Sequence, residues 1–167
     1  VRNIINARKY LLNLIWEGRL KTESKCMKDL MAKLSNILGD EFNDRVKRLI
    51  ETFPDLQVIK GVSKIGKKHI TDENNKTLGD VDVFVINQNR KKIYLIETKD
   101  FSYSRNPYEV SKEQEKVFSG RNPFLAKHLK RTDWINKHLN HVLSCYGLQE
   151  GEWCIETMFI VSEHLIT

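Results

Sequence analysis

The sequence has few cysteines and no long apolar run. Cys26, Cys145 and Cys154 are an odd number and form no CxxC pair, which argues against a disulfide framework and against a zinc ribbon. No apolar stretch approaches the roughly 20 residues that cross a bilayer, and the N-terminus lacks the charged-then-apolar order of a secretory signal. We therefore expect a soluble protein of the reducing cytoplasm with no membrane partner.

The length and the hydrophobic content fit one folded domain. With 167 residues, 40% of them hydrophobic, the chain can bury a core but is short for two domains. It begins at Val1 and ends directly after an apolar run, so we expect a piece of a longer protein with further domains. The 28 Lys and Arg residues exceed the 22 Asp and Glu residues, giving a formal charge of +6. This balance favours a polyanionic partner, although ordinary solubility charge is an equal alternative.

The N-terminal third has the spacing of helices. Leu and Ile recur every three or four residues in 3–16 and 24–37, as in amphipathic helices, and these segments predict an N-terminal helical extension over residues 1–38. A third helix is predicted over 40–53, with Asp40 placed to cap it and a proline directly after it. This third helix begins the core domain.

Beyond that proline the sequence changes to short β-prone runs. The predicted elements, in chain order, are strands at 56–65, 79–86 and 91–98, helices at 109–118 and 124–145, and a strand at 153–162. The turn-like segment 87–90 predicts a hairpin, and the polar segment 66–77 is expected to be a mobile loop. The order of helix, three strands, helix and strand predicts a mixed α/β domain over residues 39–167.

Charged residues stand at the ends of two apolar strands. Asp80 and Asp82 are two residues apart, as are Glu97 and Lys99, so each pair shares a face of its strand. If the strands form a hairpin, these charges meet at one end of the sheet. Buried carboxylates need a compensating charge, and a magnesium ion bound by Asp82 and Glu97 would supply it. Lys99 would then position a water molecule or stabilise charge on phosphorus.

This arrangement resembles the PD-(D/E)xK nuclease superfamily, whose restriction-endonuclease-like core has the order α-β-β-β-α-β with a mixed central sheet flanked by helices. Asp82 corresponds to the acid of the second core strand, and Glu97 and Lys99 correspond to the E-x-K motif of the third. The resemblance covers about residues 39–163. It implies that the main-chain carbonyl of Thr98 joins Asp82 and Glu97 as a metal ligand. It also implies Mg²⁺-dependent hydrolysis of DNA phosphodiester bonds, with Mn²⁺ as a substitute.

The sequence departs from the family pattern on the first core helix. Many relatives carry a glutamate where this chain has Asn43, and Glu41 lies on a different side of that helix. Glu41 is therefore only an auxiliary candidate, and a second metal ion is in question. Gln114 is the available counterpart of a helical Gln or Lys found in relatives, but an exposed helical glutamine is the alternative. Asp80 is either an additional ligand or an acidic neighbour of the motif.

The predicted helix at 124–145 has two contrasting sides. Its expected sheet-facing residues are Leu125, Leu129, Ile135, Leu139, Val142 and Leu143. The opposite stripe contains Lys127, Arg131, Trp134, His138 and His141. Lys127, Arg131 and Trp134 could contact nucleic acid through phosphate neutralisation and base stacking, although a solvated face is the default. His138, His141 and Cys145 lie on neighbouring turns and could join a zinc site, but no fourth ligand is evident.

The residues thus favour a DNA endonuclease domain acting in restriction, repair or defence, with Asp82, Glu97 and Lys99 as catalytic residues. A catalytically inactive nuclease-like module that binds nucleic acid or protein is the alternative, favoured by the missing helix glutamate. A structural interaction domain is the third reading, in which Asp82 and Lys99 form a simple charge pair. A homodimer that cuts two strands is compatible with the resemblance, but the sequence shows no self-complementary surface.

Overall fold

The computed structural model describes residues 2–16, 20–101 and 106–162. Its elements in chain order are α1 (Arg2–Trp16), α2 (Lys25–Glu51), β1 (Leu56–Val62), β2 (Lys64–Ile65), β3 (Lys68–His69), β4 (Val81–Asn87), β5 (Lys92–Lys99), α3 (Pro107–Gln114), the π-helix η1 (Glu115–Ser119), α4 (Phe124–Lys137), α5 (Leu139–Cys145) and β6 (Cys154–Val161). Within these residues, no helix is both long enough and apolar enough to span a membrane.

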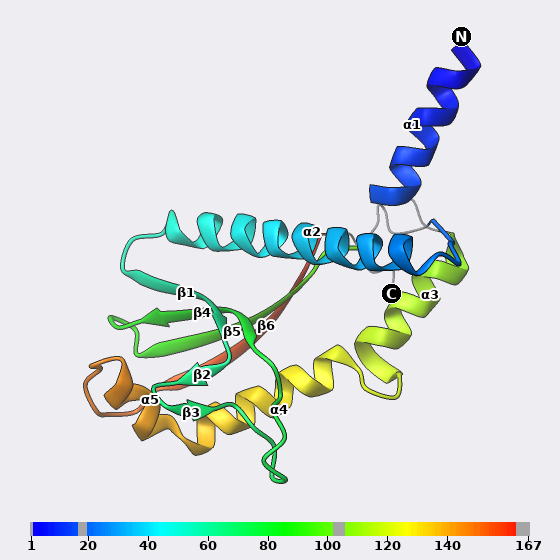
Figure 1. The fold of residues 1–167 in the computed structure, drawn as a ribbon. Coiled ribbons are helices and arrows are strands. Elements are labelled where there is room, and N and C mark those ends of the chain that lie inside the picture. Colours follow the sequence, from blue (N-terminus) through cyan, green and yellow to red (C-terminus); the bar gives the residue numbers. More distant parts are fainter. Residues whose placement is uncertain (1, 17–19, 102–105, 163–167) are drawn as a thin grey trace.

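A four-stranded mixed sheet in the order β1-β4-β5-β6 forms the centre of the molecule. β4 is antiparallel to β1 and β5, whereas β6 runs parallel to β5. α2 lies over one face of the sheet and α4 lies on the other, while α1 projects away from this body (Figure 1). The prediction of an α/β fold with a mixed sheet between helices is therefore confirmed at this level.

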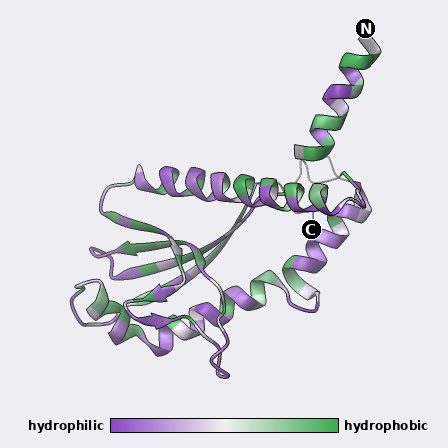
Figure 2. Ribbon diagram, in the orientation of Figure 1, coloured by the Kyte–Doolittle hydropathy of each residue, from purple (hydrophilic) through white to green (hydrophobic). Residues whose placement is uncertain are grey.

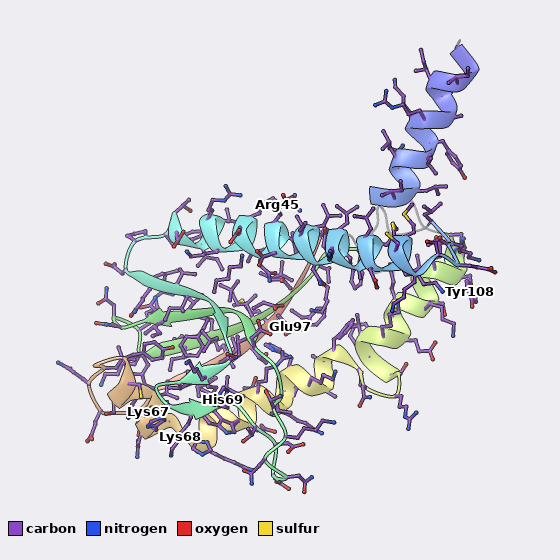
Figure 3. The ribbon with its side chains drawn as sticks, in the orientation of Figure 1. Arg45, Lys67, Lys68, His69, Glu97 and Tyr108 are labelled. Carbon is purple, nitrogen blue, oxygen red and sulfur yellow. The ribbon has the colours of Figure 1, made fainter. Side chains whose placement is uncertain are left out.

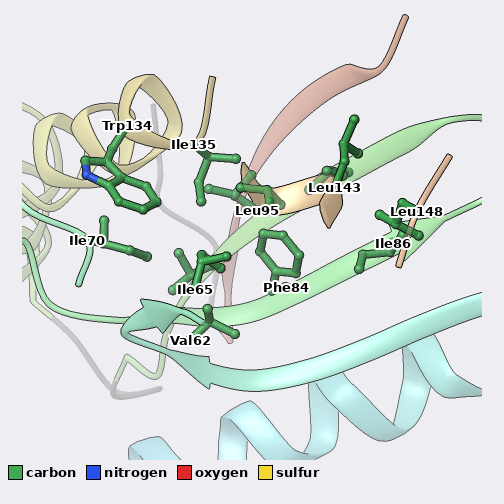
Figure 4. Close-up of a cluster of buried hydrophobic side chains, with 13 residues drawn as sticks. Val62, Ile65, Ile70, Phe84, Ile86, Leu95, Trp134, Ile135, Leu143 and Leu148 are labelled. Carbon is green, nitrogen blue, oxygen red and sulfur yellow. The ribbon is translucent and has the colours of Figure 1, made fainter. Parts of the chain in front are cut away.

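Two apolar clusters hold the helices to the sheet. On the α4 and α5 face, Phe84 and Leu95 from the central strands pack with Trp134 and Ile135 (Figure 4). The opposite face forms a smaller cluster, made of Phe42, Val46, Val83, Val85 and Ile96. Hydrophobic residues run along the strands, whereas the helices alternate in hydropathy (Figure 2). The near-continuous apolar runs of β4 and β5 follow from burial on both faces.

The two helices predicted at 24–37 and 40–53 are a single helix, α2, of 27 residues. Asp40 does not cap a new helix; its side chain pairs instead with Lys60 Nζ at 2.7 Å. Gly39 lies inside α2, because one glycine costs a helix only about 1 kcal/mol and does not by itself break it. The predicted division after residue 38 therefore lies within a continuous helix, whose buried residues Phe42 and Val46 both follow it.

The helix predicted at 124–145 is divided at His138. His138 has φ −113° and ψ 22°, outside the helical region, and separates α4 from α5. Its ring stacks on Trp134, with centroids 4.2 Å apart, and its Nδ1 lies 2.8 Å from the Trp134 carbonyl oxygen. These local contacts stabilise the break, which apolar spacing alone does not reveal.

The segments flanking β4 and α4 also differ in detail from the predictions. The predicted strand 56–65 is divided at Ser63 into β1 and β2. The predicted loop 66–77 contains β3 and a bridge between Thr71 and Thr77. The predicted helix 109–118 begins earlier, where Asn106 caps α3 in a capping box, and it continues as the π-helix η1. The Asn106 side chain fixes the start of α3, and hydrophobic spacing does not locate it.

Candidate active site

The β4 and β5 ladder places the predicted acids at one end of the sheet. Val83 pairs with Ile96 in antiparallel register, so Asp82 and Glu97 are the next residues along the two strands, and Lys99 ends β5. Lys99 Nζ lies 2.8 Å from Glu97 Oε1 and 3.7 Å from Asp82 Oδ2. The structure therefore brings the three side chains together as expected, and Figure 3 shows Glu97 between α2 and α4. Their catalytic roles stay predictions.

Asp82 is a largely buried carboxylate with a perturbed pKa. Its side chain is 15% exposed, and its Oδ2 accepts hydrogen bonds from the Thr98 main-chain N–H at 2.8 Å and the Thr98 hydroxyl at 3.2 Å. Burial raises the pKa of Asp82, and the negative charge of Glu97 raises it further, against the lowering effect of the Thr98 N–H. The charge of Lys99 also lowers the pKa of Asp82, but by less than burial raises it.

Arg131 is a buried partner of Glu97 and does not lie on an exposed cationic stripe. The residue is 6% exposed; its Nη1 bonds Glu97 Oε2, and its Nε donates to the Leu78 carbonyl oxygen at 2.9 Å. The predicted DNA contact by Arg131 is therefore wrong. Arg131 instead fixes the second oxygen of a carboxylate that is itself 4% exposed.

The predicted orientation of α4 is confirmed at Ile135, which is fully buried in the core, and is wrong at Leu129 and Trp134. Trp134 is 8% exposed and packs in the core, so the predicted base stacking by this residue is wrong, whereas Leu129, expected against the sheet, is 44% exposed. Beside Ile135, the buried face of α4 carries the polar residues His128 and Arg131, which lie against Glu97, and apolar spacing does not identify them. Lys127 is exposed, and its contact with nucleic acid stays a prediction.

His128 is a buried residue of this site that the sequence analysis missed. It is fully buried; its Nε2 lies 3.2 Å from the Leu95 carbonyl oxygen, and its Nδ1 lies 3.8 Å from Glu97 Oε2. Nδ1 makes no hydrogen bond to any residue that the structure describes. Burial lowers the pKa of His128, although the charge of Glu97 opposes this shift. The spacing of three residues between His128 and Arg131 is the signal that could have identified this face.

Thr98 links the site to α2. Its carbonyl oxygen accepts from Lys99 Nζ at 2.9 Å, and its hydroxyl hydrogen-bonds Asn43 of α2. The other auxiliary candidates are less closely engaged. Glu41 is exposed, and Asp80 is an exposed residue just before β4. Gln114 ends α3, and its role stays a prediction.

The family comparison covers nearly all of this structure. A sequence model of the family described as "Anti-phage protein Upx-like" matches residues 2–163. The chain belongs to this family. The matched range of the Upx-like chain contains the complete sheet and every residue of the site. No curated protein and no solved structure matches the chain. The family description places it among anti-phage defence proteins.

The oxygen atoms of this Upx-like site are chemically suited to magnesium. Asp82 Oδ2, Glu97 Oε1 and the Thr98 carbonyl oxygen all face Lys99 Nζ, and hard oxygen donors of this kind are the ligands that Mg²⁺ prefers. Among the described residues, no group of three or more His, Cys, Asp and Glu side chains could hold a metal ion. An ion here would therefore depend on the main-chain carbonyl and on water in addition to two carboxylates.

The described residues give no support to a zinc site on α5. His138 turns toward the Trp134 carbonyl, whereas His141 Nε2 lies 3.1 Å from the Ile65 carbonyl oxygen. Cys145 Sγ lies 3.6 Å from His141 Nε2. The three side chains do not converge on one point, so the zinc alternative has no geometric basis.

Proposed function

We propose that this Upx-like chain is a metal-dependent nuclease that hydrolyses DNA phosphodiester bonds in defence against phage. The observation that carries the proposal is the convergence of Asp82, Glu97 and Lys99 at the ends of two adjacent central strands. The order of α2, the sheet strands β1, β4 and β5, a helical segment and β6 supports it, because the core of the PD-(D/E)xK superfamily has the order helix, three strands, helix and strand. Membership of an anti-phage family supplies the biological setting.

Each residue has a specific task in this proposal. Asp82, Glu97 and the Thr98 carbonyl would hold Mg²⁺, which when bound would polarise a phosphate oxygen and acidify a water molecule. Lys99 would stabilise the charge that builds on the phosphate oxygens, because a positioned cation in a water-poor site acts strongly on such charge. Arg131 is a positioning residue, since it fixes Glu97 from α4.

The test is cleavage of plasmid, linear duplex and single-stranded DNA by the purified chain in Mg²⁺, Mn²⁺ or EDTA. Asp82→Asn and Lys99→Met should each lower the rate by roughly 10²-fold or more, the usual effect of removing a group that stabilises transition-state charge. Glu156→Gln is the matched control, because Glu156 pairs with Lys92 at the opposite end of β5 and β6. Cleavage that persists in both site variants would refute the proposal.

One observation favours a second candidate, a catalytically inactive module that binds DNA. The two carboxylates of the site already face two cations, Lys99 and Arg131, so the charges balance without a bound ion. In that case the parent should retain DNA in a gel-shift assay but should not cleave it in any divalent metal. Asp82→Asn should then bind DNA as well as the parent does.

A further inference from the structure

The two cations beside Glu97, Arg131 and Lys99, differ in how strongly the surrounding residues fix their positions. Arg131 is 6% exposed, bonds Glu97 through Nη1 and donates through Nε to the Leu78 carbonyl oxygen. Gly79 also lies close to it, because a Cβ added at Gly79 would come within 3.4 Å of Arg131 Nη2. A guanidinium does not lose its proton in proteins, so Arg131 is a permanent and fixed cation.

The side chain of Lys99 is less constrained than that of Arg131. Its side chain is 25% exposed, and a lysine carries a point charge on a flexible four-carbon stem. Its Nζ lies 4.9 Å from the ring centre of Phe124, on the side of α4. Once its contacts to β5 break, the ammonium can turn toward solvent on its own stem, whereas the buried Arg131 is held by β5 and by the segment before β4 and has no such path.

The ammonium of Lys99 contacts the same oxygen atoms that a metal ion would need. Glu97 Oε1 lies at 2.8 Å, the Thr98 carbonyl oxygen at 2.9 Å and Asp82 Oδ2 at 3.7 Å from Nζ. With two carboxylates and two cations, the site is neutral as it stands. A divalent ion added beside an unmoved Lys99 would bring an excess of two positive charges into a largely buried space, which is unfavourable.

We propose that Lys99 is the exchangeable counter-ion of this site, and that a divalent cation binds only by displacing its ammonium, while Arg131 stays on Glu97. This inference rests on the proposed function, since the ion concerned is the one that the nuclease would use. Lys99 thus regulates ion entry. Once displaced, the Lys99 ammonium stays beside the site and can contact a substrate phosphate. Ion binding and phosphate binding therefore support each other.

The test is the affinity of the purified chain for Mn²⁺, measured by titration calorimetry without DNA. Lys99→Met should bind Mn²⁺ at least about tenfold more tightly than the parent, because a unit charge close to the ion is removed. Lys99→Arg should bind as weakly as the parent, because it retains the charge. Lys92→Met is the matched control: it removes a lysine from the same strand, in an ion pair with Glu156, and should leave the affinity within about twofold.

The outcome is independent of cleavage. If Lys99→Met binds Mn²⁺ no more tightly than the parent, the exchange is overturned; thermal unfolding checks that both proteins are folded. If Lys99→Arg, which keeps the charge, binds Mn²⁺ at least about tenfold more tightly than the parent, the exchange is overturned as well. If the parent cleaves DNA and Lys99→Met binds no more tightly, only the exchange fails. If Lys99→Met binds more tightly and the parent cuts nothing, the exchange stands and the nuclease proposal fails.

Discussion

Replacement of Asp82 by asparagine should stabilise the protein at neutral pH. The change removes a buried negative charge but retains an oxygen that can accept the Thr98 N–H bond of 2.8 Å. Burial, and then the neighbouring Glu97 charge, raise the pKa of Asp82, so the ionised side chain opposes folding. The lost attraction to Lys99 at 3.7 Å acts in the other direction, and the raised pKa shows that it is the smaller effect.

The expected gain in the free energy of unfolding is about 1 kcal/mol, within the range seen when one unfavourable group is relieved. For a chain of this size that corresponds to about 2–4 °C in the midpoint of thermal unfolding. The gain should be largest above the raised pKa of folded Asp82, where that group is ionised. It should shrink as the pH falls through that pKa, because the folded parent then takes up a proton, and it should vanish below about pH 3.9, where the unfolded group is protonated too.

The assay is urea unfolding of Asp82→Asn and the parent between pH 4 and pH 8, without divalent metal. The difference between the two proteins at each pH isolates Asp82 from the other titrating groups. A variant less stable than the parent at pH 7, or an advantage that grows as the pH falls, would refute the assigned cause. Glu156→Gln serves as a control for the loss of one partly exposed carboxylate on the same sheet.

Two further predictions concern the buried face of α4. Arg131→Met should lower the free energy of unfolding by roughly 3–5 kcal/mol, because the buried carboxylates Asp82 and Glu97 are then left with Lys99 as their one cation; adding Glu97→Gln should recover part of this loss in urea unfolding, and strict additivity of the two changes would contradict the pairing. Burial lowers the pKa of His128, so the folded state resists its protonation, and the parent should lose stability as the pH falls below about 6.5 toward that lowered pKa. Thermal unfolding between pH 5 and pH 8 should show a weaker pH dependence for His128→Gln, and an unchanged dependence would count against this assignment.

The apolar runs contained enough information to place the central strands. β4 and β5 match the predicted strands within two residues at each end, and the antiparallel register then brings Asp82 and Glu97 together. The prediction of these two strands is confirmed because strands that are buried on both faces need apolar side chains at nearly every position. The charges at their ends therefore stand out from the sequence.

The helices were less predictable, for physical reasons that differ between them. On α4 the buried face combines the expected Ile135 with His128 and Arg131, which lie against Glu97 at the sheet, so apolar spacing identifies only part of that face. On α2 Asp40 was expected to cap a new helix, yet the helix continues through it, and Asp40 pairs with Lys60 instead. The role of Asn43 depends on a tertiary contact with Thr98 that no local pattern encodes.

The position of β6 affects when the site can be completed during synthesis. β5 lies between β4 and β6, and Lys99 pairs in register with Val161, which follows it by more than sixty residues. A nascent chain that has emerged only as far as α5 already contains Asp82, Glu97, Lys99 and Arg131, but β5 still has an open edge. The ribosome must therefore release almost the whole domain before the strand that carries two of the charged groups is paired on both sides.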